Sequence, residues 1–150
     1  MATFRERPYS GTNFQVDLGT GDPEGPLAGF SEVVMPSGMI DVTEYRSGNS
    51  KISGSLKLPG VTRYRNVILK RGVLGALDLF EWWDQARNGD PDVRRTVTIS
   101  LLSEDRSDVV MKWKLTNAWP VGYETTELSG TQSKILLEVI ELAYEHLDVE

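Results

Sequence analysis

The chain has 150 residues, of which 39% are hydrophobic and 25% charged, a composition typical of one globular domain over residues 1–150. Its 16 Lys and Arg against 22 Asp and Glu give a net charge of −6, which argues against nucleic acid or an anionic membrane as the main partner. Cysteine is absent, so the sequence excludes disulfides, zinc thiolate sites and a thiol nucleophile.

Targeting signals are not evident in the sequence. Residues 1–7 carry charges without a following apolar run, so we expect no signal peptide. No segment approaches the roughly 20 apolar residues that a membrane-spanning helix needs. We therefore expect a protein that is synthesised and folded in the cytoplasm and has no membrane anchor.

The first third of the chain predicts strands separated by turns. Phe14, Val16 and Leu18 alternate with polar residues, and turn formers then occupy most of residues 19–26. A second strand is predicted over residues 29–35.

Residues 37–60 are predicted to form a long extended loop. They hold four glycines and few apolar residues, and an apolar strand at residues 64–71 follows them. A structureless segment of this length is uncommon inside a compact domain, so we expect it to act outside its own core.

Residues 73–88 are predicted to form a helix, which Gly89 and Pro91 end. Its apolar stripe, at three- and four-residue steps, consists of Val73, Ala76, Leu77, Phe80 and Trp83. Trp82 falls at the edge of this stripe. Because Trp82 and Trp83 cannot both face one core, we expect one to be buried and regard the other as a candidate interface anchor.

Two segments, residues 95–101 and 109–115, alternate apolar and polar side chains around a charged turn, which predicts a hairpin. A further strand is expected over residues 121–125. The last segment, residues 133–148, fits either a helix or a strand, and its local pattern favours a helix.

No combination of residues predicts a catalytic site. His146 is the only histidine and has ordinary acidic neighbours, and the paired acids lie mainly in predicted turns. Glycines at positions 19, 21 and 25 lead into a strand instead of a helix, so they do not form a dinucleotide-binding loop. We expect a protein that is not an enzyme and has no catalytic, metal-binding or cofactor-binding residues.

The densest basic cluster surrounds Tyr64 and consists of Arg63, Arg65, Lys70 and Arg71. Basic residues next to an aromatic can bind single-stranded nucleic acid. Pairing with nearby acids fits the net charge of −6 better, and we prefer it.

Several short motifs follow one another along nearly the whole chain. They are Glu44-Tyr45-Arg46-x-Gly48-Asn49, Lys57-Leu58-Pro59-Gly60, Val67-Ile68-Leu69-Lys70-Arg71-Gly72, Trp82-Trp83, Asn117-Ala118-Trp119-Pro120 and Glu138-x-x-Glu141-Leu142-Ala143. With these motifs in this order, the chain resembles the tail tube proteins of contractile-tailed phages and the inner tube proteins of extracellular contractile injection systems. It departs from the family at Ser47, where an acid is common, and at residues 142–146, which leaves the subfamily open.

The resemblance implies a mainly β fold: two packed antiparallel sheets forming a β-barrel, with one flanking α-helix at about residues 73–88, as in the haemolysin-coregulated protein of type VI secretion. It also implies a strand over most of residues 133–147, because barrel closure can override a modest helix preference.

The function implied by the resemblance is structural. Six subunits would form a ring, and the rings would stack into a hollow inner tube that a contracting sheath drives into a target. The implied partners are further copies of the chain, the sheath protein, the baseplate or spike hub, the tube cap and, in the lumen, cargo protein or phage DNA.

In this family the segment equivalent to the long loop contacts neighbouring subunits, around the ring and between rings. The resemblance therefore places the inter-subunit interface on Glu44, Tyr45, Arg46, Gly48, Asn49 and Lys57. Trp82 and Arg87 are further candidates for contact with the sheath or a neighbour. The residue types fit: Glu44 and Arg46 offer opposite charges, Tyr45 an amphipathic anchor and Gly48 freedom to bend.

Two alternatives stay open at this point. The chain could instead be a monomeric β-barrel that binds a ligand through Trp113, Trp119 and Tyr123. The polar faces at residues 96–100 and 112–114 are both candidates for the lumen, and the sequence does not distinguish a phage tail from an injection particle.

Overall fold

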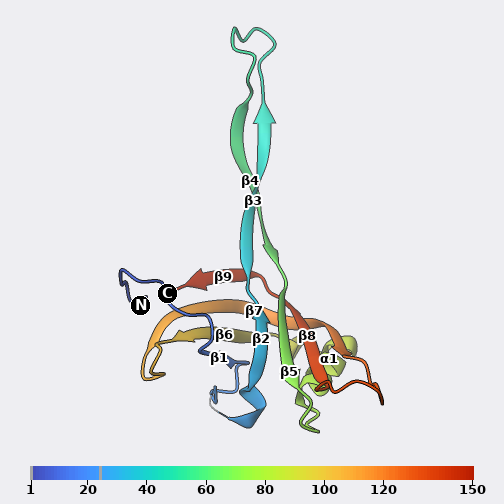
Figure 1. Ribbon diagram of the computed structural model, residues 1–150. Helices are drawn as coiled ribbons and strands as arrows, with labels where there is room; N and C mark the ends of the chain where they lie inside the picture. The colour runs from blue at the N-terminus through green and yellow to red at the C-terminus, as the bar shows by residue number, and fades with distance from the viewer. Residues whose placement is uncertain (1, 24) are drawn as a thin grey trace.

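The structure, a computed structural model, describes residues 2–23 and 25–150. As predicted, it is mainly β with one α-helix (Figure 1). The strands are β1 (Phe14–Asp17), β2 (Phe30–Val34), β3 (Ser37–Tyr45), β4 (Leu56–Arg65), β5 (Val67–Gly72), β6 (Arg95–Leu102), β7 (Val109–Thr125), β8 (Leu137–Ala143) and β9 (His146–Val149). The helix is α1 (Asp78–Arg87), and two 3-10 turns are η1 (Pro26–Ala28) and η2 (Pro91–Val93).

Seven strands form one curled antiparallel sheet in the order β1-β6-β7-β8-β5-β2, with β9 paired to β7. Strand β7 is 17 residues long, and its first part pairs with β6 and β9 while its second part pairs with β8. Between the two parts Asn117 adopts a left-handed φ of 54°, which Asn tolerates better than most residues. The strands predicted over residues 109–115 and 121–125 are therefore two parts of one bent strand.

The prediction of two antiparallel sheets is confirmed, whereas the closed barrel is not. The second sheet is the pair β3–β4. Within residues 2–23 and 25–150, the larger sheet ends at β1 on one side and β2 on the other, and no ladder joins these edges. Phe14 of β1 and Val33 of β2 nevertheless pack against the same core, so the sheet curls round without closing through hydrogen bonds.

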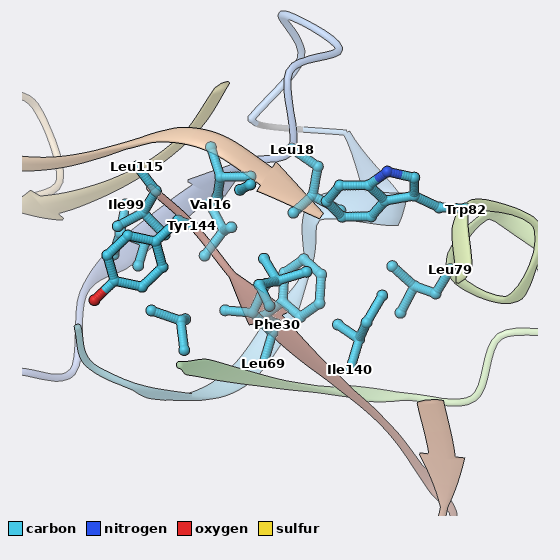
Figure 2. Packing of buried hydrophobic residues seen from close by; sticks show 14 of the residues in the cluster. Val16, Leu18, Phe30, Leu69, Leu79, Trp82, Ile99, Leu115, Ile140 and Tyr144 are labelled. Carbon is cyan, nitrogen blue, oxygen red and sulfur yellow. The ribbon is translucent and has the colours of Figure 1, made fainter. Parts of the chain in front are cut away.

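The curled sheet encloses one hydrophobic core (Figure 2). Val16, Ile99 and Leu115 enter it from β1, β6 and β7, and Leu69 and Ile140 enter it from β5 and β8. Each of these side chains is at most 2% exposed. They are the inward members of alternating strands, and burying each stabilises the fold by about 1.5–3 kcal/mol.

Helix α1 begins later than predicted, at Asp78 instead of residue 73. Residues 73–77 form a loop, in which Gly75 takes a left-handed φ of 78°. Glycine adopts this conformation without steric cost, and it is incompatible with a continuous right-handed helix. Several members of the predicted apolar stripe therefore lie in the loop and not on the helix.

The helix is also rotated relative to the predicted stripe. Leu79 and Trp82 are its buried residues, while Phe80 and Trp83 remain partly exposed. The Trp82 indole N–H donates a hydrogen bond of 2.8 Å to the Val93 carbonyl, which satisfies its polar atom inside the core. The expectation that one tryptophan of the pair is buried is thus confirmed.

The helix that the local pattern favours for residues 133–148 is wrong, and the strand implied by the family resemblance is correct. Strand β8 pairs with β5 on one side and β7 on the other, and β9 pairs with β7. Because a central strand satisfies its backbone groups on both edges, this pairing outweighs a modest local helix preference.

Candidate assembly interface

The predicted extended loop over residues 37–60 is a β-hairpin. Strand β3 pairs with β4 from Ser37 opposite Arg65 to Tyr45 opposite Leu56. The hairpin, residues 37–65, projects far from the body at the top of Figure 1. We call residues 37–65 the arm and residues 46–55 its tip.

The arm continues the sheet of the body. Residues 35–36 alone separate β2 from β3, and Asn66 alone separates β4 from β5, so the β2–β5 ladder runs on into the β3–β4 ladder. At the root, the Tyr64 ring lies 5.4 Å from the buried Tyr144 ring and 6.3 Å from the His146 ring, measured between centroids. The arm is therefore a two-stranded sheet that leaves the body directly from β2 and β5, and not a tethered loop.

A bulge partway along the arm depends on a glycine. The strand register shifts between Ile40 and Val42, where Gly60 lies against Asp41. A Cβ atom at Gly60 would stand 2.8 Å from the Asp41 carbonyl oxygen, so any side chain would force the strands apart. The Arg63 Nε donates a 2.7 Å hydrogen bond to the Asp41 carboxylate and braces the same region.

Arg46 shapes the tip. Its guanidinium donates hydrogen bonds to the carbonyls of Ser50 and Ile52, each at 3.3 Å. The Ser50 N–H donates to the Ser47 carbonyl at 3.1 Å. Gly48 has open space around it and does not adopt a left-handed φ, so this conformation does not itself require glycine there. Arg46 thus has a structural role within the arm besides its predicted contact role.

Both faces of the arm carry exposed apolar side chains. Residues opposite each other in an antiparallel pair share a face, so Tyr45 and Leu56 lie on one face and Val42 and Pro59 on the other. The apolar residues that are more than half exposed are Met39, Ile40, Val42, Tyr45, Ile52, Leu56, Leu58 and Val61. Such a surface makes each side of the hairpin a candidate for a protein contact.

A second exposed cluster lies on the outward side of α1. The Phe80 ring is 6.0 Å from Trp83 and 5.7 Å from Tyr123, and the Arg87 guanidinium lies 4.9 Å above the Trp83 ring. Trp82, predicted to contact the sheath or a neighbour, is only 1% exposed, and a buried ring offers no contact surface. In this subunit Trp82 therefore presents no surface to a partner, and the partly exposed Trp83 lies beside Arg87 instead.

A buried ionic cluster holds α1 to the sheet. Arg71 is fully buried and donates hydrogen bonds to Asp78 (2.7 and 3.0 Å), to Glu138 (2.9 and 3.3 Å) and to the Leu27 carbonyl (2.7 Å). The Tyr123 hydroxyl donates to Glu138 at 2.9 Å. Burial alone would raise the pKa of Asp78, but the hydrogen bonds and charge of Arg71 outweigh it and hold that pKa below its usual value. Burial and the bond to Glu138 raise the pKa of Tyr123.

The basic cluster at residues 63–71 pairs largely with acids of its own chain, as preferred from the sequence. Besides the Arg71 contacts, Arg63 pairs with Asp41 at 2.7 Å and Lys70 with Glu32 at 3.3 Å. These pairs neutralise most of the positive charge that a nucleic-acid strand would need.

The residues expected for a ligand-binding barrel do not converge. Trp113 lines a hollow of about 480 Å³ between β1 and β2, whereas Tyr123 lines a separate hollow of about 240 Å³ over β5 and β8. Residues 2–23 and 25–150 contain no group of three or more His, Cys, Asp or Glu side chains placed to hold a metal ion. No helix in this described part of the chain is long and apolar enough to cross a membrane.

The model of one protein family, described as the T4-like virus tail tube protein gp19, matches residues 10–148. The match spans nearly the whole chain. The chain belongs to this family of tail tube proteins. Its function is therefore that of a structural tube subunit.

Solved structures contain chains of the same fold. One chain in the cryo-EM structure of an extracellular contractile injection system, the PVC sheath-tube complex in its extended state, matches with a TM-score of 0.82 and 26% identity over 97% of this chain and 93% of that chain. A chain in the anti-feeding prophage baseplate also reaches 0.82, at 24% identity over 97% of both chains. Hcp1 from Flavobacterium johnsoniae matches at 0.54 with 16% identity, over 91% and 93% of the two chains. A comparison with curated protein sequences gives no match.

In this tail tube protein the six predicted interface residues all lie at the outer end of the arm. Glu44 and Lys57 are cross-strand partners beside the Tyr45–Leu56 pair. Arg46, Gly48 and Asn49 lie in the tip.

The sequence-based prediction missed the exposed apolar residues of the arm, such as Ile40, Val42, Leu56 and Leu58. Their spacing at every second residue was a usable strand signal. It was obscured because apolar residues occur on both faces and the surrounding glycines and serines suggest a loop.

Proposed function

We propose that residues 1–150 form one tail tube domain whose copies assemble, six to a ring, into the stacked rings of a hollow inner tube in a contractile injection apparatus. The arm is the observation that carries this proposal, because a sheet extension with exposed apolar residues on both faces needs a partner on each side. Copies of the same chain supply both partners if one face contacts a neighbour in the ring and the other a neighbour in the next ring.

The residues at the outer end of the arm have distinct roles in this proposal. Tyr45 contributes an amphipathic ring to the contact, and Glu44 and Lys57 present opposite charges side by side. Arg46 keeps the tip in shape through its bonds to the backbone. Gly48, with Asn49 beside it, keeps the tip narrow enough for close approach of a neighbouring backbone.

The body acts as a barrel whose seam lies between β1 and β2. The hollow between these edges is lined by Phe14, Val33 and Trp113, and all three side chains pack against the common core. The barrel gives the arm a rigid base, and its outer polar strand faces are available to line the lumen.

The partners of the tube follow from its place in the apparatus. Similar chains occur in a sheath-tube complex, a baseplate and a tube-terminating cap, which supports a sheath, a baseplate or spike hub and a cap as partners here. Phe80, Trp83 and Arg87 on α1 form the candidate sheath contact. The tube catalyses nothing, binds no cofactor and conducts protein cargo or phage DNA through its lumen. It is assembled into a phage tail or injection particle.

The test is a variant in which Glu44, Tyr45 and Arg46 are all changed to alanine. A composition-matched control changes Phe4, Arg5 and Glu6, which lie outside the arm. Size-exclusion chromatography and negative-stain microscopy should show tubes for the wild type and the control, and folded subunits or separate rings for the arm variant. Circular dichroism establishes that each variant is folded.

Two results would contradict the proposal. One is a wild-type protein that stays monomeric at high concentration, which would favour a monomeric binding module. The other is an arm variant that forms tubes of normal length, which would remove the arm from the assembly interface.

A further inference from the structure

The arm and the rest of the chain carry opposite charge. Residues 37–65 hold five Lys and Arg against two Asp and Glu, a net charge of +3, whereas the remaining residues hold eleven against twenty, a net charge of −9. The arm projects away from its own body (Figure 1), and Arg63 at its root pairs with Asp41, so its excess positive charge towards the tip can meet an acidic surface on another molecule.

Two loops at the end of the body away from the arm (Figure 1) carry an exposed apolar surface. It is formed by the β5–α1 loop and the β7–β8 loop, which a 3.0 Å hydrogen bond from the Val73 N–H to the Leu136 carbonyl holds together. Its exposed apolar residues are Val73, Leu74, Leu77, Leu128 and Ile135. We call these five residues the end patch.

The charges around the end patch complement those of the tip. Exposed acids lie close to the patch along the chain: Glu81 in the first turn of α1, Glu124 near the end of β7 and Glu127 in the β7–β8 loop. Lys134 is the basic residue of the β7–β8 loop. The outer end of the arm combines apolar residues with Arg46, Lys51 and Lys57 against the single acid Glu44. One surface is thus apolar and acidic, and the other apolar and basic.

We propose that the end patch receives the arm tip of a second copy of this chain. The proposal rests on the proposed function, a tube of stacked rings, and identifies the surface through which one ring contacts the next. The apolar residues of the tip, Tyr45, Ile52 and Leu56, cover those of the patch. The basic residues of the tip face the acids around it.

The geometry makes this contact intermolecular. Strand β5 starts at the root of the arm and ends at Gly72, opposite Leu137, next to the end patch. The strand path from Phe30, opposite Arg71, to Tyr45 spans about 50 Å at roughly 3.3 Å per residue, so a tip cannot reach the patch of its own chain. A contact between opposite ends of identical molecules is head-to-tail and does not close, which is the contact that a stack requires.

Disulfide mapping tests the proposal directly, because the native chain has no cysteine. Ile52→Cys places a thiol in the tip and Leu128→Cys places one on the end patch, where the native side chains are 73% and 85% exposed. A disulfide requires Cα atoms within about 7 Å, so mild oxidation of the assembled double variant should give a ladder of dimers, trimers and longer species on a non-reducing gel. Ile52→Cys with Ile135→Cys tests a second position on the patch.

Matched controls separate this contact from chance collisions. Ile52→Cys alone, and Ile52→Cys with Phe4→Cys, should give no ladder, although Phe4 is 91% exposed. A second measurement uses Leu128→Lys/Ile135→Lys, which should form rings that fail to stack, whereas Phe4→Lys should stack normally.

The outcomes distinguish this inference from the proposed function. If the cysteine variants form tubes but neither pair gives a ladder, and the double lysine variant also stacks normally, the end patch is not the receiving surface and the tube function stands. If the double lysine variant forms tubes but loses only sheath, cap or baseplate binding, the patch belongs to that other protein and the inference is overturned. If the wild-type chain does not self-associate at all, both the inference and the proposed function fail.

Discussion

Replacing the buried Arg71 is predicted to be the most damaging single change to the folded subunit. Its guanidinium has no exposed surface and connects β5 to Asp78 at the start of α1 and to Glu138 on β8. Arg71→Met keeps most of the side-chain volume but removes five hydrogen bonds. Helix α1 then loses its ionic attachment to the sheet.

The size of the stability loss follows from the buried carboxylate that Arg71→Met leaves without its partner. Glu138 is 4% exposed, and after the substitution the Tyr123 hydroxyl at 2.9 Å is the side-chain donor that remains to it. Removing one partner of a buried ion pair costs about 3–5 kcal/mol, because the other charge stays buried and uncompensated. Domain stabilities are about 5–15 kcal/mol, so we expect Arg71→Met to remove a large share of the free energy of unfolding.

Urea unfolding followed by far-UV circular dichroism measures this loss, at a concentration where sedimentation shows the same assembly state for every variant. The control is Arg94→Met, which breaks an ion pair with Glu145 at 3.3 Å whose side chains are both 53% exposed and which should cost only about 0–1 kcal/mol. Adding Glu138→Gln to Arg71→Met should restore part of the stability, since the buried charge is then gone. A cost of less than about 1 kcal/mol for Arg71→Met, or a further loss on adding Glu138→Gln, would refute the reasoning.

Three further changes test other parts of the structure. Gly60→Ala should leave the body folded but prevent tube assembly, because its Cβ would stand 2.8 Å from the Asp41 carbonyl and distort the arm; microscopy and circular dichroism show both effects. Trp82→Phe should lower the free energy of unfolding by about 1–3 kcal/mol in urea, since it removes a buried indole hydrogen bond and leaves a cavity. Hydrogen bonds from Ser103 and Ser107 lower the pKa of Asp105 from 3.8 to about 2, so its contribution to stability is present above about pH 4 and is lost as the pH falls towards 2; thermal midpoints of the wild type and Asp105→Asn should therefore converge in that window.

Each of these changes has its own control. Gly54 lies in the tip with open space around it, so Gly54→Ala should assemble normally, and equal assembly of the Gly54→Ala and Gly60→Ala variants would contradict the bulge argument. Trp83→Phe, at a partly exposed position, should cost less than Trp82→Phe, and the reverse order would mean that the helix faces are wrongly assigned. If the thermal midpoints of the wild type and Asp105→Asn differ by the same amount from pH 5 to pH 2, Asp105 does not contribute to the loss of stability in acid.

Much of the body could be predicted from the sequence because its strands are half-buried. The alternation at residues 95–101 and 109–115 predicts the β6–β7 hairpin, and Val97, Ile99 and Leu115 are its buried members. The position of the interface candidates outside the core could also be predicted, from the length and glycine content of residues 37–60.

The arm, the helix face and the last strands were harder to predict for separate physical reasons. The arm is exposed on both faces, so its strands lack the one-sided alternation on which strand prediction depends. The helix face depends on where the chain leaves β5, and the turn at Gly75 shifts the start of α1 by five residues, from 73 to 78. Strand β8 is a strand because β5 and β7 lie on its two edges, which its own residues do not reveal.

By itself, the sequence determined what depends on local chemistry: the alternating strands, the absence of cysteine chemistry, the paired basic cluster and a family resemblance that a match over residues 10–148 confirms. Only the tertiary structure decided which residues of this tail tube protein are left uncovered. Exposure is set by the packing of segments far apart in the chain, which buries Trp82 and leaves Trp83 partly exposed although the two are adjacent. The pairing of β3 with β4, directly beyond the paired strands β2 and β5, likewise makes the predicted loop an arm with two exposed faces.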